Sequence, residues 1–241
     1  MTNETINIYK DAKALSEGFT SFLQTEMEDK ESISISLSGG STPKTLFQYW
    51  AECCNNLIEW QKMCFFWGDE RCVPPDDPMS NYGMTKKFLF DFIEKITPSH
   101  IHRIHGENDI KDELRKYEGI LSRELPKHNE LPCFDIMMLG LGDDGHTASI
   151  FPDQIELWES RRNCVEAVHP ETKMKRISLT GRIINNSNNI AFLVTGKNKA
   201  RKVKEIIGER DKFMNLYPAA RVNPTHGNLY WFLDEEAASL L

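Results

Sequence analysis

The 241-residue sequence has no long hydrophobic segment, because no apolar run approaches the ~20 residues that a membrane-spanning helix requires. Its first 15 residues also lack the basic and apolar regions of a secretory signal peptide. There is no stretch rich in glycine and serine, no low-complexity tract and no internal repeat to mark a linker. These absences favour a cytoplasmic protein with a single domain over residues 1–241.

Positive charge is scarce: 29 Lys and Arg residues stand against 36 Asp and Glu residues, for a formal net charge of -7. A broad nucleic-acid or anionic-membrane surface needs a basic patch, so the balance argues against both partners. Taken alone, it also disfavours an anionic substrate. The hydrophobic fraction of 40% suffices for a sizeable core, which argues against intrinsic disorder.

The six cysteines form no Cys-x-x-Cys pair, and two of them, Cys53 and Cys54, are adjacent. Zinc sites use close cysteine pairs, and disulfide frameworks belong to short secreted chains. The sequence therefore predicts free thiols in a reducing compartment. His100, His102 and His105 form a His-x-His-x-x-His motif that suggests a metal, but no acidic or cysteine ligand shares the spacing, so we expect no metal site there.

Strand-like and helical patterns alternate along the chain. The expected strands are 32–38, 63–67, 101–104, 134–139, 164–168, 177–179, 190–194 and 229–233. The expected helices are 11–30, 44–54, 84–93, 109–125, 197–208 and 235–240. This alternation predicts a three-layer α/β fold with a mostly parallel, Rossmann-like sheet and helices on both faces. Ligands bind at the carboxyl ends of such strands, so the loops at Gly39, Gly68 and Gly140 are the candidate sites.

The first candidate loop has the sequence SGGSTP and joins an expected strand to an expected helix. Gly39 and Gly40 let the backbone approach a ligand closely, and Ser41 and Thr42 add hydroxyl donors. The start of the helix adds partial positive charge, so the combination suits a phosphate. Pro43 is expected at the first helical position with Thr42 as the N-cap. A plain glycine-rich turn with a hydroxyl cap is the alternative.

The second candidate loop has the sequence GDER and places three charges directly after an apolar strand. Arg71 can clamp a phosphate or carboxylate with its planar guanidinium group. The two acids, Asp69 and Glu70, can orient that arginine or contact sugar hydroxyls. A solvated turn with local ion pairs is the alternative.

The third candidate loop, residues 140–145, matches the G-x-G-x-x-G dinucleotide fingerprint. Asp143 and Asp144 contradict that function because they place negative charge where a pyrophosphate would lie, and Pro152 would interrupt the helix that must hold it. His146 follows in the same loop. Imidazole can take and return a proton near neutral pH, and Asp144 can set its tautomer. The two side chains are therefore a candidate acid–base pair, with a histidine satisfied by local hydrogen bonds as the alternative.

Positive charge follows two later strands. Lys199 lies in the first helical turn after strand 190–194, where a lysine is unfavourable to the helix dipole and so indicates a nearby anion. Arg176 and Arg182 flank another expected strand. Together with Arg71 and the backbone amides of the SGGSTP loop, these cations can form one phosphate pocket.

Several segments, taken in order, resemble the 6-phosphogluconolactonases: SLSGGSTPKTLF, FFWGDERCVPPDDPMSNYGM, FDIMMLGLGDDGHTASIFP, RISLT, LVTGKNKA and LYWFLDEEAA. The resemblance runs from about Ser36 to the C-terminus. It implies the α/β fold of the glucosamine-6-phosphate deaminases, which belong to the same superfamily. It also implies hydrolysis of 6-phosphoglucono-1,5-lactone to 6-phosphogluconate in the oxidative pentose phosphate pathway, without a cofactor.

The same resemblance assigns roles to individual residues. His146 would be the catalytic acid–base, with Asp144 orienting it. Arg71, Lys199 and the SGGST loop would hold the 6-phosphate, and Arg176 would join them. The implied partner is a small phosphosugar lactone, and the sequence leaves a monomer and a small homo-oligomer both open.

Two alternative functions remain at this point. Deaminases resemble DGHIAFNEP at the histidine motif, with a glutamate where this chain has Phe151, and DEY where this chain has DER. Both departures favour the lactonase. The second alternative is a non-catalytic sugar-phosphate-binding domain, but no helix-turn-helix segment or basic tail accompanies the chain and the histidine–aspartate pair is intact.

Overall fold

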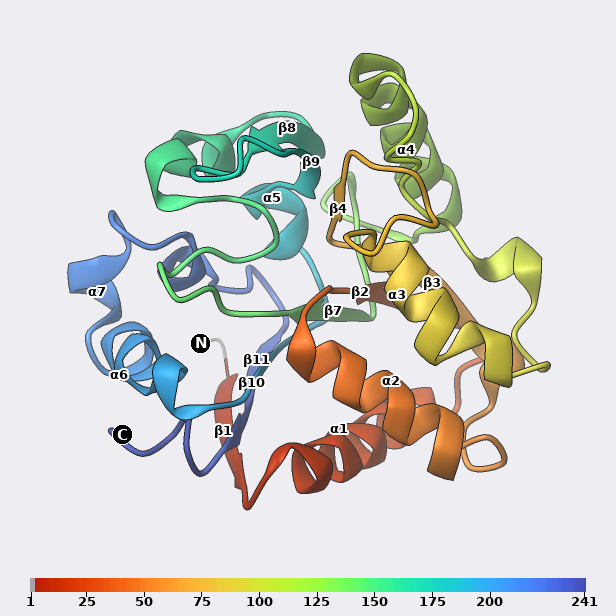
Figure 1. Cartoon of the computed structure of the whole chain (residues 1–241), viewed down its shortest axis with the longest axis horizontal. Helices are drawn as coiled ribbons and strands as arrows, with labels where there is room; N and C mark the ends of the chain where they lie inside the picture. Colours follow the sequence, from red (N-terminus) through yellow and green to blue (C-terminus); the bar gives the residue numbers. More distant parts are fainter. Residues whose placement is uncertain (1–2) are drawn as a thin grey trace.

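The computed structural model describes residues 3–241 and contains a central sheet of six parallel strands in the order β1-β11-β10-β7-β2-β3 (Figure 1). These strands are β1 (Asn3–Tyr9), β2 (Ile33–Leu37), β3 (Met63–Trp67), β7 (Ile136–Leu139), β10 (Asn189–Val194) and β11 (Asn228–Asp234). Every residue of β2, β7 and β10 is buried, as expected for central parallel strands that are covered on both faces. The predicted parallel sheet is confirmed.

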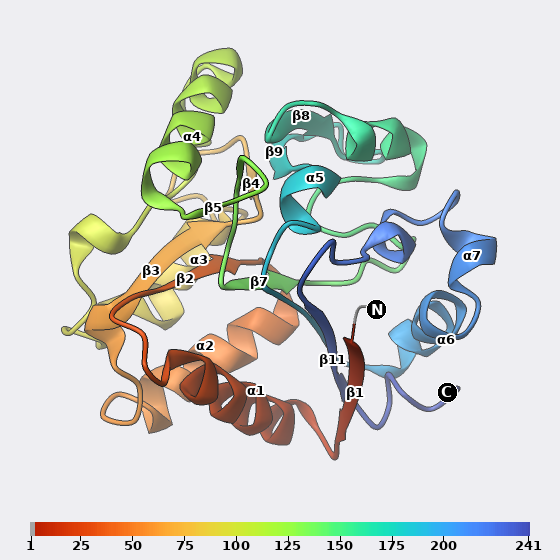
Figure 2. The same ribbon diagram turned by 180° about the vertical axis from the view of Figure 1, so that it is seen from behind.

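Helices cover both sides of this sheet. The α-helices are α1 (Ala12–Met27), α2 (Ser41–Cys53), α3 (Asn81–Phe88), α4 (Ile110–Glu124), α5 (Gly181–Ile184), α6 (Ala200–Gly208) and α7 (Arg210–Phe213). The short 3-10 helices are η1 (Trp60–Lys62), η2 (Phe90–Phe92), η3 (Pro98–His100), η4 (Pro152–Glu159), η5 (Lys197–Lys199) and η6 (Pro218–Arg221). In Figure 1 and Figure 2 alike, α1 and α2 lie on one side of the sheet, with α4 and α5 on the other.

A second, antiparallel sheet of three strands lies on the α5 side and was not predicted (Figure 2). It consists of β4 (Asp69–Arg71), β9 (Lys175–Leu179) and β8 (Cys164–Val168), in the order β4-β9-β8. The GDER segment expected as a loop is therefore an edge strand. Its register pairs Arg71 with Arg176, so the pairing brings together two arginines that are far apart in the sequence. A small hairpin of β5 (Lys127–His128) and β6 (Leu131–Pro132) completes the strands.

One further strand was missed, and two other expectations about strands and helices are wrong. Strand β1 was missed because it is an edge strand whose residues are exposed or only half-buried, so it lacks a buried apolar pattern. The expected strand at 101–104 is reduced to one bridge between Ile101 and Phe65. The expected helix at 235–240 is a series of turns, since six residues are too few to favour a helix without strong packing.

Two helix starts also differ from expectation. Helix α2 begins at Ser41 with Gly40 as its N-cap, so Thr42 is not the cap and Pro43 is not the first helical residue. Helix α3 begins at Asn81, capped by the Ser80 side chain, instead of at residue 84. In both cases the helix starts closer to the preceding strand end than the sequence indicated.

The parallel arrangement brings several loops to one edge of the sheet. The chain leaves β2 at Ser38, β3 at Gly68, β7 at Gly140 and β10 at Thr195. Because neighbouring parallel strands end at the same edge, these loops form one surface, which is where ligands bind in folds of this kind.

Within residues 3–241, no helix has both the length and the hydropathy needed to span a membrane. All six cysteines are free, as predicted. The assignment of the whole chain to one domain stays a prediction.

Candidate active site

A cavity of about 270 Å³ lies where the carboxyl ends of β2, β3, β7 and β10 meet. The predicted site residues that line it are Gly39, Gly40, Ser41, Thr42, Arg71, His146, Arg176 and Lys199. Asp144 does not line the cavity but contacts His146 directly. Arg182, considered from the sequence as a further cation, is not in the lining, and its guanidinium group donates to the carbonyl oxygen of Arg161.

The imidazole of His146 is held by Asp144. Asp144 Oδ1 lies 2.6 Å from His146 Nδ1 and accepts the backbone N–H of His146 at 3.0 Å. Burial opposes ionisation of this carboxyl group, but its hydrogen bonds and charge interaction with His146 outweigh burial and lower the pKa of Asp144 to about 2. An ionised Asp144 makes Nδ1 the hydrogen-bond donor, which leaves Nε2 available to accept a proton.

Gly142 makes room for this pair. A Cβ atom at Gly142 would lie 2.1 Å from His146 Nδ1 and 2.6 Å from Asp144 Oδ1, far inside van der Waals contact. The ring of Phe151 lies 4.7 Å from the His146 ring and is buried. The imidazole therefore packs closely against both Gly142 and a buried aromatic ring.

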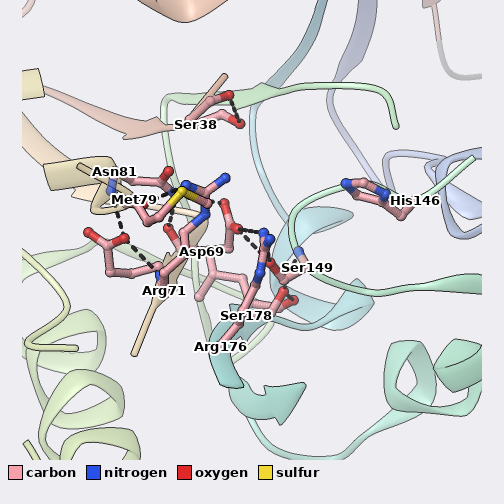
Figure 3. A network of polar contacts seen from close by, with 12 residues as sticks. Ser38, Asp69, Arg71, Met79, Asn81, His146, Ser149, Arg176 and Ser178 are labelled. Atoms are coloured by element: carbon pink, nitrogen blue, oxygen red, sulfur yellow. Dashed lines mark hydrogen bonds and ion pairs between the residues drawn. The ribbon is translucent and has the colours of Figure 1, made fainter. Parts of the chain in front are cut away.

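Two guanidinium groups lie at another part of the cavity, apart from His146 (Figure 3). Arg71 Nη1 donates to the carbonyl oxygen of Met79 at 2.5 Å. Arg176 Nη1 lies 3.8 Å from Asp69 Oδ2 and 3.3 Å from Ser149 Oγ. Burial lowers the pKa of Arg176, which Asp69 opposes. Within residues 3–241 the buried Nε atom of each arginine has no hydrogen-bond partner. Each guanidinium group therefore keeps an N–H donor with which it can bind an anion.

Glu70 has a structural role that the sequence did not predict. Its carboxylate is buried and accepts the backbone N–H groups of Arg71, Asn81 and Tyr82 together with the hydroxyl of Ser80. Burial raises the pKa of Glu70 to about 7, although the backbone hydrogen bonds oppose that shift. Glu70 therefore connects β4 to the N-terminus of α3, and it does not line the cavity.

Replacing Glu70 with glutamine is expected to lower the free energy of unfolding by about 1–3 kcal/mol, because an amide nitrogen cannot accept the hydrogen bonds that one carboxylate oxygen accepts. Urea denaturation measures this loss. Glu52→Gln on the exposed surface of α2 is the matched control, with an expected change within about 0.5 kcal/mol. Equal stability of the two variants would contradict the structural role.

The SGGST loop lines the cavity at the N-terminus of α2, where the first N–H groups of a helix have no partner within it and suit a phosphate. Gly40 has a φ of 109°, a conformation that favours glycine. A Cβ atom at Gly39 would lie 1.9 Å from Asn81 Oδ1, so the Asn81 side chain packs directly against this glycine. The hydroxyls of Thr42 and Thr195 lie 2.7 Å apart, joining this loop to the end of β10.

Sequence reasoning did not select several residues of this site. Asn81 lines the cavity, and its side chain donates to the backbone carbonyl of Asp69 at 2.9 Å. Ser149 donates to Asp69 Oδ2 at 2.5 Å, and Asp69 in turn faces Arg176. The available signal was position: Asn81 starts a helix after a proline-rich loop, and Ser149 lies three residues after His146.

Lys199 lines the cavity from the turn that follows β10. Its Nζ atom lies 2.5 Å from Asp143 Oδ1, and the same oxygen accepts a hydrogen bond from Asn198 at 2.8 Å. The positive charge of Lys199 is therefore paired with Asp143 in the structure, and the sequence did not predict this pairing.

The three histidines of the His-x-His-x-x-His motif do not line the cavity. His102 stacks on the ring of Phe66 at 4.6 Å, and Glu107 lies 3.6 Å from His105. Across the described part of the chain, residues 3–241, no three His, Cys, Asp or Glu side chains are grouped as a metal site requires. That the protein needs no metal or cofactor stays a prediction.

Comparison with known proteins identifies the family. The family model for glucosamine-6-phosphate isomerases/6-phosphogluconolactonase matches residues 10–231. The chain belongs to this family. It is 45% identical over 211 residues to the 6-phosphogluconolactonase of Haemophilus influenzae, covering 87% of this chain and 88% of that relative. The family resemblance seen in the motifs is thereby confirmed.

Solved structures in the family share the fold. The chain is similar to the 6-phosphogluconolactonase from Trypanosoma brucei, with a TM-score of 0.88, 29% identity and 100% of both chains covered. It is also similar to a monomeric glucosamine-6-phosphate deaminase of the NagB superfamily, with a TM-score of 0.80, 22% identity, and 98% and 100% of the two chains covered. The predicted deaminase-like fold is confirmed.

Proposed function

We propose that the chain hydrolyses 6-phosphoglucono-1,5-lactone to 6-phosphogluconate, a step of the oxidative pentose phosphate pathway. The observation that carries this proposal is one cavity lined both by His146, which Asp144 contacts from outside the lining, and by Arg71 and Arg176. A phosphosugar lactone offers an ester carbonyl to the first pair and an anion to the second. The similarity to relatives named 6-phosphogluconolactonase supports the same substrate.

The substrate's phosphate would bind to the cations and to the SGGST loop. Arg71, Arg176 and Lys199 supply the charge, and the N–H groups at the start of α2 supply further donors. These side chains line the cavity even though the chain as a whole is acidic. The net charge of -7, which taken alone disfavoured an anionic substrate, does not describe the cavity.

The proposed reaction uses His146 first as a base and then as an acid. Nε2 takes a proton from a water molecule whose oxygen attacks C1 of the lactone. Backbone amides or a nearby cation stabilise the tetrahedral oxyanion. The bond between C1 and the ring oxygen then breaks, and protonated His146 returns the proton to that oxygen. Asp144 stabilises the imidazolium, and no covalent enzyme intermediate is needed because a lactone is already an activated ester.

The site lacks one carboxylate that the deaminase motif contains. Phe151 occupies the position that the deaminase motif gives to a glutamate, and its ring lies 4.7 Å from the imidazole of His146. A phenyl ring cannot transfer a proton, so the ring-opening chemistry of the deaminase is left without that carboxylate.

The test of the proposed function is an assay with two substrates. Fresh 6-phosphogluconolactone is added and acid release is followed above the spontaneous rate, while glucosamine 6-phosphate is tested in parallel for ammonia release. We expect excess acid and no ammonia. Ammonia without excess acid would assign the deaminase reaction, and binding of both sugars without turnover would assign a sugar-phosphate-binding domain.

Replacing Asp144 with asparagine is expected to lower kcat about ten- to a thousandfold, because the amide neither secures the imidazole tautomer nor stabilises the imidazolium. Steady-state assays with fresh lactone measure this loss. The control is Asp153→Asn, which removes a carboxylate from an exposed position outside the cavity. Similar kcat values for the two variants would contradict the role of Asp144.

Asp144 should also make stability depend on pH in acid. Its pKa falls from 3.8 in the unfolded chain to about 2 in the folded protein, so the ionised carboxylate stabilises the fold above pH 3.8 and this stabilisation is lost as the pH falls towards 2. The difference in unfolding free energy between wild type and Asp144→Asn should therefore shrink between pH 5 and pH 2. Urea denaturation across this range measures it, and a constant difference would contradict the assignment.

The proposed setting of this activity is the cytoplasm, with a small phosphosugar lactone as the partner. Neither nucleic acid nor a membrane is expected to bind, because the acidic composition disfavours a broad basic surface. Size-exclusion chromatography would decide between a monomer and a small homo-oligomer.

A further inference from the structure

Two carboxylates face cations in the proposed active site, and they are held in different ways. Asp69 faces Arg176; its side chain is only 6% exposed and accepts the hydroxyl of Ser149. Asp143 faces Lys199, and its side chain is 70% exposed. The first carboxylate is locked inside the protein, whereas the second lies at the solvent-exposed mouth of the cavity.

The topology of the sheet explains why Asp143 and Lys199 meet. Strands β7 and β10 are hydrogen-bonded neighbours, so the loops that follow them lie side by side. Asp143 comes from the β7 loop, and Asn198 and Lys199 come from the turn after β10. Asp143 Oδ1 is the shared acceptor, 2.5 Å from the lysine and 2.8 Å from the asparagine amide.

The contacts of Asp143 are easily exchanged. An ion pair with one exposed partner contributes little free energy, because water screens it. A phosphate dianion carries about twice the charge of a carboxylate and has three oxygens that accept hydrogen bonds. It can contact Lys199 and the N–H groups of the SGGST loop at the same time, because both line the same cavity. The Asp143 carboxylate contacts Asn198 and Lys199, which both belong to the turn after β10.

We propose that Asp143 forms an ion pair with Lys199 in the ligand-free protein, and that the phosphate of a bound sugar phosphate replaces Asp143 as the partner of this lysine. Asp143 is then a specificity-determining residue, because it lowers the affinity of the cavity for any anion that cannot displace it from Lys199. This inference rests on the proposed function in one respect, that Lys199 binds the phosphate group. It predicts that removing the competing carboxylate tightens phosphate binding.

The test is a double-mutant cycle with inorganic phosphate as the probe, measured by isothermal titration calorimetry at pH 8. The proteins are wild type, Asp143→Asn, Lys199→Met and the double variant. We expect Asp143→Asn to lower the dissociation constant about two- to fivefold, the effect of a partly exposed ion pair. In the Lys199→Met background the same substitution should leave the dissociation constant unchanged, because the lysine for which the carboxylate competes is gone.

Two controls separate this effect from its alternatives. Asp211→Asn removes the same charge from an exposed position that does not line the cavity, and it should not change phosphate binding. A decrease that persists in the Lys199→Met background would show long-range charge repulsion and overturn the proposal. An unchanged or higher dissociation constant for Asp143→Asn would overturn it too.

The outcome is separable from that of the proposed function, because phosphate binding is measured without turnover. If wild type fails to hydrolyse the lactone while the cycle behaves as expected, the function fails and the role of Asp143 stands. If wild type hydrolyses the lactone and the cycle shows no coupling between Asp143 and Lys199, the function stands and the role of Asp143 fails.

Discussion

Replacing His146 with alanine is expected to lower kcat for lactone hydrolysis by about 10²–10⁴, the contribution of a positioned general acid–base. In the proposed mechanism the side chain removes a proton from water and returns it to the ring oxygen, and water alone would perform both transfers slowly. The fold should remain intact, because the imidazole is 27% exposed and lies at the wall of a cavity. Single-turnover or steady-state assays with fresh lactone measure the loss, and thermal denaturation checks the fold.

His226→Ala is the matched control for that experiment. His226 is an exposed histidine outside the cavity, so its removal should leave kcat little changed. Near-normal turnover of the His146→Ala variant would remove this residue from the mechanism. Loss of activity accompanied by loss of the folded state in both histidine variants would show that the assay reports stability instead of catalysis.

Replacing Gly142 with alanine is expected to lower kcat about 100-fold, the cost of misplacing a catalytic group by roughly an ångström. The new Cβ atom would lie 2.1 Å from His146 Nδ1 and 2.6 Å from Asp144 Oδ1, so both side chains must move away from it. Crowding of this kind also costs about 1–3 kcal/mol of stability. Lactone assays and urea denaturation measure the two effects separately.

A second glycine in the same loop provides the control. At Gly140 the nearest atom to a new Cβ atom is Ser38 Oγ at 3.6 Å, an ordinary van der Waals contact. Gly140→Ala should therefore retain most of the activity. If both alanine variants are equally active, the close approach of Gly142 to the histidine–aspartate pair has no catalytic consequence.

Much of the central sheet was predictable because its signals are local. The apolar runs at 63–67, 134–139 and 190–194 lie close to the observed strands β3, β7 and β10, since a strand buried on both faces must be apolar throughout. The edge strand β1 was not predicted, because its residues are exposed or only partly buried and its hydrophobic pattern is therefore weak. Helix starts were misplaced where a cap depended on a glycine conformation, as at Gly40.

The role of Glu70 shows the limit of reading charge from sequence. Three consecutive charged residues after a strand suggested side chains that contact a ligand. In the structure, Arg71 lines the cavity and has no ion-pair partner among residues 3–241, while Asp69 and Glu70 are buried and hydrogen-bonded. Their burial depends on the later strand β9 and on helix α3, which the GDER segment itself does not encode.

The sequence by itself determined the parallel sheet, the family and the loops that line the cavity, because hydrophobic period, glycine positions and motif order are properties of short segments. Only the tertiary structure decided how the charges in those loops pair. Arg71 lies beside Arg176 because β4 pairs with β9, and Lys199 meets Asp143 because β7 and β10 are neighbours in the sheet. Pairing between distant strands depends on the packing of the whole core, and no short segment contains that information.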